Sequence, residues 1–98
     1  MARYSVYRLR SGSRVVDCQA DVLAHLASRF VIPLMQPEQH PVAIARLNPI
    51  LAFGPEHLML ATHLAVSIPV REIATELGTL ADQEFTISNA IDLLLGGF

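Results

Sequence analysis

Alternating polar and apolar positions at the start of the chain predict a β-hairpin. Residues 4–9 (YSVYRL) alternate with the period of two that is typical of a half-buried strand. The turn-forming residues 11–13 (SGS) follow, and residues 14–18 (RVVDC) have the apolar content of a returning strand. Residues 20–28 carry no clear period, so the pattern there predicts a loop or a short helical turn.

Two apolar segments in the middle of the chain predict further strands. Residues 30–35 (FVIPLM) are apolar and rich in β-branched side chains. Because Pro33 has no amide hydrogen, we expect it at a sheet edge, a bulge or a kink. The polar residues 36–41 (QPEQHP) then predict a loop.

A second hairpin is predicted around residues 54–57 (GPEH). Apolar segments 47–53 and 58–68 flank this turn signal on both sides. Residues 71–77 (REIATEL) favour a short helix that ends at Gly78.

The clearest helical period lies near the end of the chain. Thr79 is followed three residues later by Asp82, which is a capping-box pattern at a helix start. Gly96 is expected to end the helix. Five apolar residues recur at helical spacing between them, namely Leu80, Ile87, Ile91, Leu94 and Leu95. Strands followed by one terminal helix predict an α+β, mainly β fold built on a small barrel.

Composition adds an expected second subunit to this picture. The 98 residues suffice for one domain, spanning 1–98. Hydrophobic residues make up 52% of the chain and charged residues only 16%. Since one small domain hides that much apolar surface with difficulty, we expect a homodimer.

Charge is unevenly distributed along the chain. The net charge of −2 argues against binding of nucleic acid by bulk electrostatics. Residues 1–50 carry six arginines and three acidic residues, whereas residues 51–98 carry one arginine and six acidic residues. Arg8, Arg10 and Arg14 cluster around the first predicted turn, where they form a candidate site for an acidic peptide or a phosphate. The alternative is a solubilising rim around an apolar sheet.

The sequence favours a cytoplasmic protein. Cys18 is the one cysteine and lies in an apolar segment, so we expect a buried side chain that fills space. The arginine-rich start of the chain does not resemble a signal peptide. Residues 58–70, the most apolar window, are too short to span a bilayer, so no membrane partner is expected.

Nothing in the sequence nominates a catalytic centre. His25, His40, His57 and His63 are scattered without a recognised metal-ligand spacing. Nucleophile, zinc-protease and phosphate-loop motifs are all missing from the sequence. The residues therefore indicate no catalytic site, and we expect no metal or cofactor.

Taken in order, several segments resemble the CcdB family, the toxin half of a bacterial toxin–antitoxin pair. The matching stretches are YSVY at 4–7, DCQAD at 17–21, RFVIPL at 29–34, RLNP at 46–49 with Gly54, SIPV at 67–70 and NAIDLL at 89–94. The resemblance implies a dimer on an SH3-like β-barrel with a long C-terminal helix. It also implies that the protein is not an enzyme. Such a protein would bind the A subunit of DNA gyrase, trap the cleavage complex and be neutralised by an antitoxin. DNA would be contacted only through gyrase or the antitoxin complex.

The family's gyrase contacts can be carried over to individual positions of this sequence. They fall on Asp92, Leu95, Gly96, Gly97 and Phe98 at the end of the predicted helix, and the apolar run IDLLLGGF is consistent with a contact tip. A second patch falls on Ala20 and Val22. The chain departs from the best-known members at Gly96, because they have a tryptophan there that stacks on a gyrase arginine.

Two alternatives stay open. MazF-type toxins share this fold and cleave RNA, so an endoribonuclease is a second hypothesis. A non-toxic homologue that binds only the antitoxin is a third, and the glycine at position 96 motivates it. The resemblance and chain position make Arg8, Arg10, Arg14 and the loop at 36–45 candidate antitoxin contacts.

Overall fold

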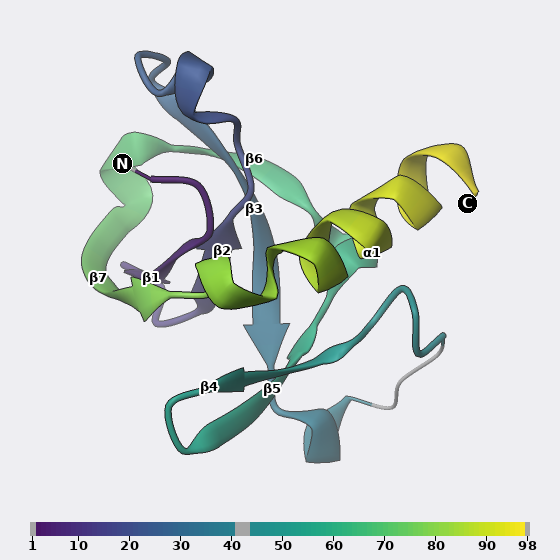
Figure 1. Cartoon of the computed structure of the whole chain (residues 1–98). Helices are drawn as coiled ribbons and strands as arrows, with labels where there is room; N and C mark the ends of the chain where they lie inside the picture. Colours follow the sequence, from purple (N-terminus) through teal and green to yellow (C-terminus); the bar gives the residue numbers. More distant parts are fainter. Residues whose placement is uncertain (1, 41–43, 98) are drawn as a thin grey trace.

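The computed structural model describes residues 2–40 and 44–97, which form a curled β-sheet with one helix packed against it (Figure 1). The strands are β1 (Ser5–Leu9), β2 (Arg14–Asp17), β3 (Ser28–Met35), β4 (Ile50–Phe53), β5 (Glu56–Leu60), β6 (Val66–Pro69) and β7 (Ile73–Thr79). Helix α1 spans Glu84–Gly96, and short 3-10 turns are η1 (Asp21–Leu23), η2 (Pro37–Gln39), η3 (Thr62–Leu64), η4 (Val70–Glu72) and η5 (Ala81–Gln83).

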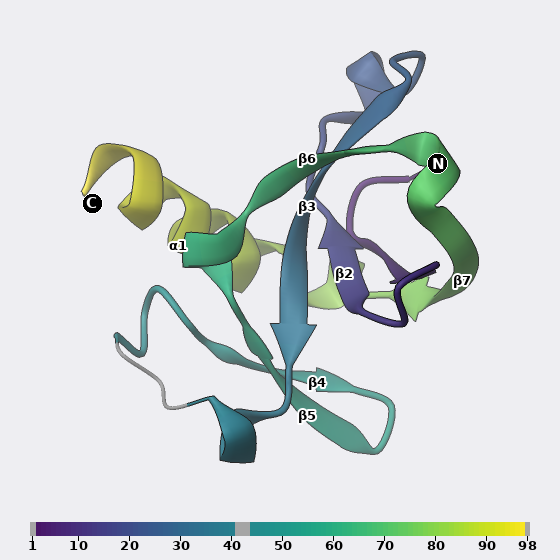
Figure 2. The same ribbon diagram turned by 180° about the vertical axis from the view of Figure 1, so that it is seen from behind.

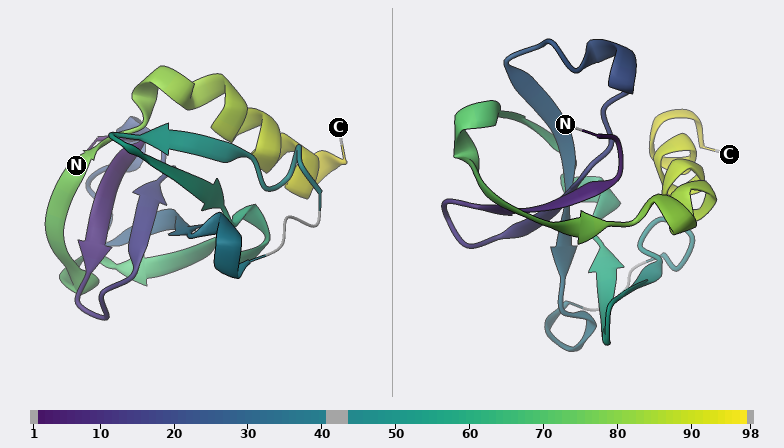
Figure 3. Two further views of the ribbon diagram at one scale, coloured as in Figure 1. Left: turned by 90° about the horizontal axis from the view of Figure 1, so that it is seen from below. Right: turned by 60° about the vertical axis from the view of Figure 1, so that its left-hand side comes forward.

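The sheet is antiparallel and has the order β4-β5-β3-β2-β1-β7. Strand β6 lies outside this path and also pairs with β3. Because β3 pairs with β2 on one side and with both β5 and β6 on the other, it is shared by every part of the sheet. Figures 2 and 3 show the strands curling around this shared strand. The predicted fold, a small barrel-like β structure with a C-terminal helix, is confirmed.

Both predicted hairpins are present. Val6 of β1 faces Val16 of β2, and Ile50 of β4 faces Met59 of β5. The second turn is tighter than predicted, since residues 56 and 57 already belong to β5.

Pro33 lies within the central strand β3, so of the three predicted positions (an edge, a bulge or a kink) the edge is wrong. Its carbonyl accepts a hydrogen bond from the amide of Ala61 at 2.9 Å. In an antiparallel ladder the nitrogen and carbonyl of one residue point to the same neighbour. The nitrogen of Pro33, which has no hydrogen to donate, therefore faces the point where the strand next to β3 changes from β6 to β5. No hydrogen bond between strands is lost there.

Two other predicted elements are wrong. Residues 58–68 are not one strand, because η3 separates β5 from β6 where the chain passes between two parts of β3. Residues 71–77 are not a helix, because Ile73–Thr79 pairs with β1 as strand β7. Pairing with an exposed strand edge outweighs the modest helix preference of alanine, glutamate and leucine at these positions.

The sheet has an apolar cluster on each face. The larger cluster lies under α1 and includes Ile32, Leu58, Leu80 and Ile87, with Ile91 packed against it. The smaller cluster has Tyr7, Val15 and Val31 at its centre. Tyr7 is buried, and this burial raises the pKa of its hydroxyl.

The two edge strands of the curled sheet approach each other without pairing. A Cβ atom at Gly78 of β7 would lie 3.0 Å from the ring of Phe53 in β4, so glycine permits this close approach. The side chain of Gln83 covers the free edge of β4: its Oε1 accepts from the Ala52 amide at 3.0 Å and its Nε2 donates to the Ala52 carbonyl at 2.7 Å. Gln83 therefore pairs with β4 as a neighbouring strand would.

Helix α1 differs from its prediction at both ends. The Thr79 hydroxyl accepts a hydrogen bond from the Ala81 amide at 3.1 Å and opens the turn η5, while α1 itself begins at Glu84. At the other end Gly96 is the last helical residue, and Gly97 (φ 77°) has the left-handed conformation expected one residue earlier. Its amide donates to the Leu93 carbonyl at 2.9 Å.

We expect Gln83→Ala to lower the free energy of unfolding by about 1–2 kcal/mol, because two hydrogen bonds to the β4 edge are lost. Urea unfolding followed by circular dichroism measures the change. Gln39→Ala, at an exposed glutamine in η2, is the matched control and should change stability by less than about 0.5 kcal/mol. Equal effects of the two substitutions would contradict the role assigned to Gln83.

Candidate functional site

The end of α1 carries the first group of residues that the resemblance singled out. Asp92, Leu95, Gly96 and Gly97 are all exposed, and the Leu95 side chain is 78% exposed. The last helical turn extends past the strands (Figure 1). Leu95 therefore does not pack on the core, and the prediction that it lies on the buried apolar face of the helix is wrong. Phe98, the fifth residue of this group, lies outside the described residues.

The second predicted patch lies in the loop between β2 and β3. Ala20 precedes η1 and is exposed, while Val22 within η1 is 80% exposed. Leu23 and Leu26 add partly exposed apolar surface to the same loop. Figures 1 and 2 show this loop at one end of the sheet and the last turn of α1 at its side. The structure thus presents two apolar projections that are separate within one chain.

Gln19 holds the base of this loop in place. Its Oε1 accepts from the Phe30 amide at 2.9 Å, and its Nε2 donates to the Leu23 carbonyl at 3.0 Å. The backbone amide of Gln19 donates in turn to Oδ1 of Asp17 at 3.0 Å. The buried side chain of Gln19 therefore fixes the backbone on both sides of Val22.

Asp17 is itself held by a fully buried ion pair with Arg29. Oδ2 of Asp17 accepts from Nε of Arg29 at 2.7 Å and lies 2.6 Å from its Nη2 atom. Both side chains have no exposed surface. Nη1 of Arg29 has no hydrogen-bond partner among the described residues. A buried arginine and aspartate depend on one another, because either charge alone would be costly in this environment.

The three predicted antitoxin-contacting arginines do not form one cluster. Arg14 makes two hydrogen bonds to the carboxylate of Glu56, at 2.7 and 3.1 Å, and these bonds lower the pKa of that carboxyl group. Arg8 faces Arg14 across the hairpin. Arg10 lies at the hairpin end and donates from Nε to the carbonyl of Arg71 at 2.6 Å. The predicted cluster of Arg8, Arg10 and Arg14 is therefore divided between two surroundings. The predicted loop at 36–45 is described only in part, because residues 41–43 lie outside the described residues.

The remaining candidate groups have structural surroundings. Cys18 is buried as predicted, and burial raises the pKa of its thiol to about 12. His25, His40, His57 and His63 are exposed. Nδ1 of His63 lies 3.1 Å from Nδ2 of Asn48.

The described residues include neither a group of metal-ligating side chains nor a helix able to span a bilayer. Among residues 2–40 and 44–97, no three histidine, cysteine or acidic side chains are grouped as metal ligands. The helix in that part of the chain is too short and too polar to cross a bilayer.

Sequence reasoning missed the polar network beneath the loop, although a signal for it exists. Period-two alternation places Arg29 on the same face of its strand as the buried Val31. A charge on a buried strand face requires a partner of opposite charge. Asp17 can be that partner, because it lies opposite Val31 on the adjacent strand, two residues from Arg29. Arg71 was also missed, because its segment was predicted as a helix.

We expect Arg29→Met to lower the free energy of unfolding by about 3–5 kcal/mol, because Asp17 is left as an uncompensated buried charge. Combining it with Asp17→Leu should recover most of the loss, since both charges are then removed. Urea unfolding of the two variants measures this, with Arg46→Met at an exposed arginine as control. A double variant no more stable than the single one would contradict the interpretation.

Comparisons with known proteins agree with this architecture. The family model described as "CcdB protein" matches residues 3–97. The solved structure titled "Endoribonuclease from Mycobacterial species" superimposes with a TM-score of 0.79 and 18% identity, covering 98% of this chain and 91% of that chain. "Mycobacterium tuberculosis toxin MazF-mt6" gives a TM-score of 0.66 and 20% identity, with 93% of each chain covered.

The two kinds of match carry different weight. At these identities the structural likeness shows the fold that this chain has in common with the two proteins, and no more. The family match is independent of that likeness and spans nearly the whole sequence, including the β2–β3 loop and α1. The chain therefore belongs to the CcdB family, the toxins of toxin–antitoxin systems.

Proposed function

We propose that this toxin binds the A subunit of DNA gyrase through the last turn of α1 and the loop around Val22, and that it traps the cleavage complex. The observation that carries the proposal is Leu95, an apolar side chain 78% exposed on the projecting end of a helix whose other turns are packed on the sheet. The family match supports gyrase as the partner.

Physical chemistry favours these two projections as contact points. Full burial of one exposed leucine or valine against a partner stabilises a complex by about 1.5–3 kcal/mol. Leu95 and Val22 are held on a helix and on a hydrogen-bonded loop, so little of this gain is lost in ordering them. With glycine at position 96, Leu95 is the most exposed large apolar side chain of the last described turn, and Leu94 beside it is 41% exposed.

We propose that the protein acts as a homodimer and without a catalytic step. Large side chains such as Leu64, Val66 and Phe85 are also more than 40% exposed, and a second copy of the chain would bury part of this apolar surface. Its partners would be gyrase and a cognate antitoxin, and it would meet DNA only through them. Trapping a protein–DNA complex requires a complementary surface, so the proposal uses no metal, cofactor or catalytic residue.

The test is a cleavage assay with purified gyrase, supercoiled plasmid, ATP and this protein. Linear DNA released after detergent and protease is the expected result. Leu95→Asp should reduce it at least about tenfold, because a charge replaces the central apolar contact. Thr86→Asp is the matched control: Thr86 is a polar, exposed residue near the start of the same helix, and its replacement should leave cleavage unchanged.

Other outcomes reject the proposal. Unchanged cleavage by the Leu95→Asp variant would place the contact elsewhere. If the folded protein releases no linear DNA, gyrase poisoning is rejected. RNA degradation by the same sample would then favour the endoribonuclease. If RNA is not degraded either, the result favours the non-toxic homologue, the hypothesis that Gly96 motivates.

For the dimer, light scattering coupled to gel filtration should give a mass of twice the 10.7 kDa chain at micromolar concentration. Burial of apolar surface between two copies is the reason for this expectation. A mass of one chain across that concentration range would contradict it.

A further inference from the structure

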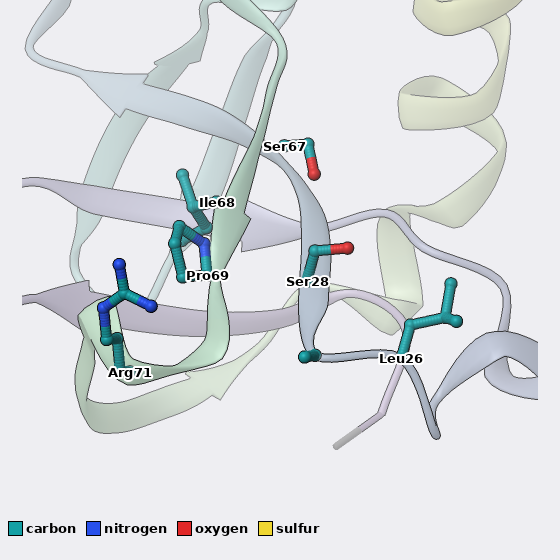
Figure 4. Close-up of a pocket in the computed structure, with 7 residues that line it drawn as sticks. Leu26, Ser28, Ser67, Ile68, Pro69 and Arg71 are labelled. Atoms are coloured by element: carbon teal, nitrogen blue, oxygen red, sulfur yellow. The ribbon is translucent and has the colours of Figure 1, made fainter.

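A pocket lies between the β2–β3 loop and β6. Leu26 brings it next to the loop of Val22, but none of its lining residues is among those assigned to gyrase. Its volume is about 470 Å³. The lining includes Leu26 and Ser28 on one side and Ser67, Ile68, Pro69 and Arg71 on the other. Figure 4 shows these side chains spread along β6 and the start of β3, with Leu26 at one end and Arg71 at the other.

Backbone hydrogen bonds fix both walls of the pocket. Ser28 faces Pro69 in the β3–β6 ladder, and the amide of Val70 donates to the carbonyl of Ala27 at 2.9 Å. The loop and η4 therefore keep their separation without a ligand. A ligand that fits this shape would lose little free energy to rearrangement of the protein.

The electrostatics of the pocket favour an anionic ligand. Arg10 donates to the backbone carbonyl of Arg71, which brings a second guanidinium group to the Arg71 end of the pocket. Within the described residues neither guanidinium forms an ion pair, and Glu72, the neighbouring acid in the sequence, is partner to neither. Guanidinium groups bind carboxylates through paired hydrogen bonds, so this end is suited to an acidic side chain.

The rest of the surface favours a polypeptide in extended form. Ile68 and Pro69 on one side and Leu26 on the other give the pocket its apolar lining, while the hydroxyls of Ser28 and Ser67 supply polar contacts. Strand β6 pairs with β3 and with no other strand of the described chain, so its second edge offers backbone donors and acceptors. An added strand can use such an edge while its side chains enter adjacent pockets.

We propose that this pocket binds an extended acidic and apolar polypeptide segment, with an apolar side chain against Leu26 and Ile68 and a carboxylate at Arg10 and Arg71. In a toxin–antitoxin pair the antitoxin is the partner that would carry this segment, and that assignment rests on the function proposed above. The chemistry of the pocket does not depend on gyrase.

The experiment is an NMR titration of the isotope-labelled full chain with an acetylated and amidated hexapeptide of alternating leucine and glutamate. We expect amide shifts at Ser28, Ser67, Ile68 and Arg71. Arg71→Gln should weaken binding about tenfold, since a charge-assisted hydrogen bond to the ligand is lost. Arg46→Gln, at an exposed arginine of the segment before β4, should leave the affinity unchanged.

Three results would overturn the proposal: no shifts at the pocket with 5 mM peptide, equal shifts with the leucine–lysine counterpart, or full affinity in Arg71→Gln. Ser67→Tyr, which fills the pocket and leaves both arginines in place, should abolish the same shifts. The gyrase assay is independent of this titration. Peptide binding without DNA cleavage would reject gyrase poisoning and support the proposed peptide site. DNA cleavage without peptide binding would support gyrase poisoning and reject the peptide site.

Discussion

The buried ion pair between Asp17 and Arg29 is the interaction on which the geometry of the candidate binding surfaces depends. It joins β2 to β3 where the chain leaves the sheet for the exposed loop. Asp17 uses its second oxygen to hold Gln19, and Gln19 fixes the loop backbone on both sides of Val22. The buried charges of Asp17 and Arg29 thus determine where the exposed side chain of Val22 lies.

The shared strand β3 explains how so short a chain supports two separate surfaces. On one side of β3 the strand β2 leads to the loop of Val22, and on the other β6 forms the wall of the arginine-lined pocket. Helix α1 is connected to the far edge of the sheet by Gln83 and to the core by Ile87. Under the two proposals, the loop of Val22 would contact the target and the β6 wall of the pocket would contact the inhibitor, with Leu26 of that loop bordering the pocket.

Patterns within single segments predicted much of the fold, but contacts between distant segments did not follow from them. The alternation of residues 4–9 gave the first hairpin and the spacing of Ile87 and Ile91 gave α1, because each pattern reports burial of one face. Strand β7 was missed, since its conformation is decided by pairing with β1, more than sixty residues away. The arginine cluster was divided for the same reason: Glu56 and the Arg71 carbonyl come from distant parts of the chain.

The attachment of α1 at its first turns has a consequence for the rates at which complexes form and break. The helix is ordered by the core and by Gln83 before any partner arrives, so docking of its last turn requires few torsion angles to be fixed. Association should then proceed as a single encounter, without a folding step that slows it. Differences in affinity among variants of this surface would accordingly appear in how long the complex lasts. Under the proposed function, the time that the toxin stays on its target is therefore the property that substitutions in the last turn of this helix would change.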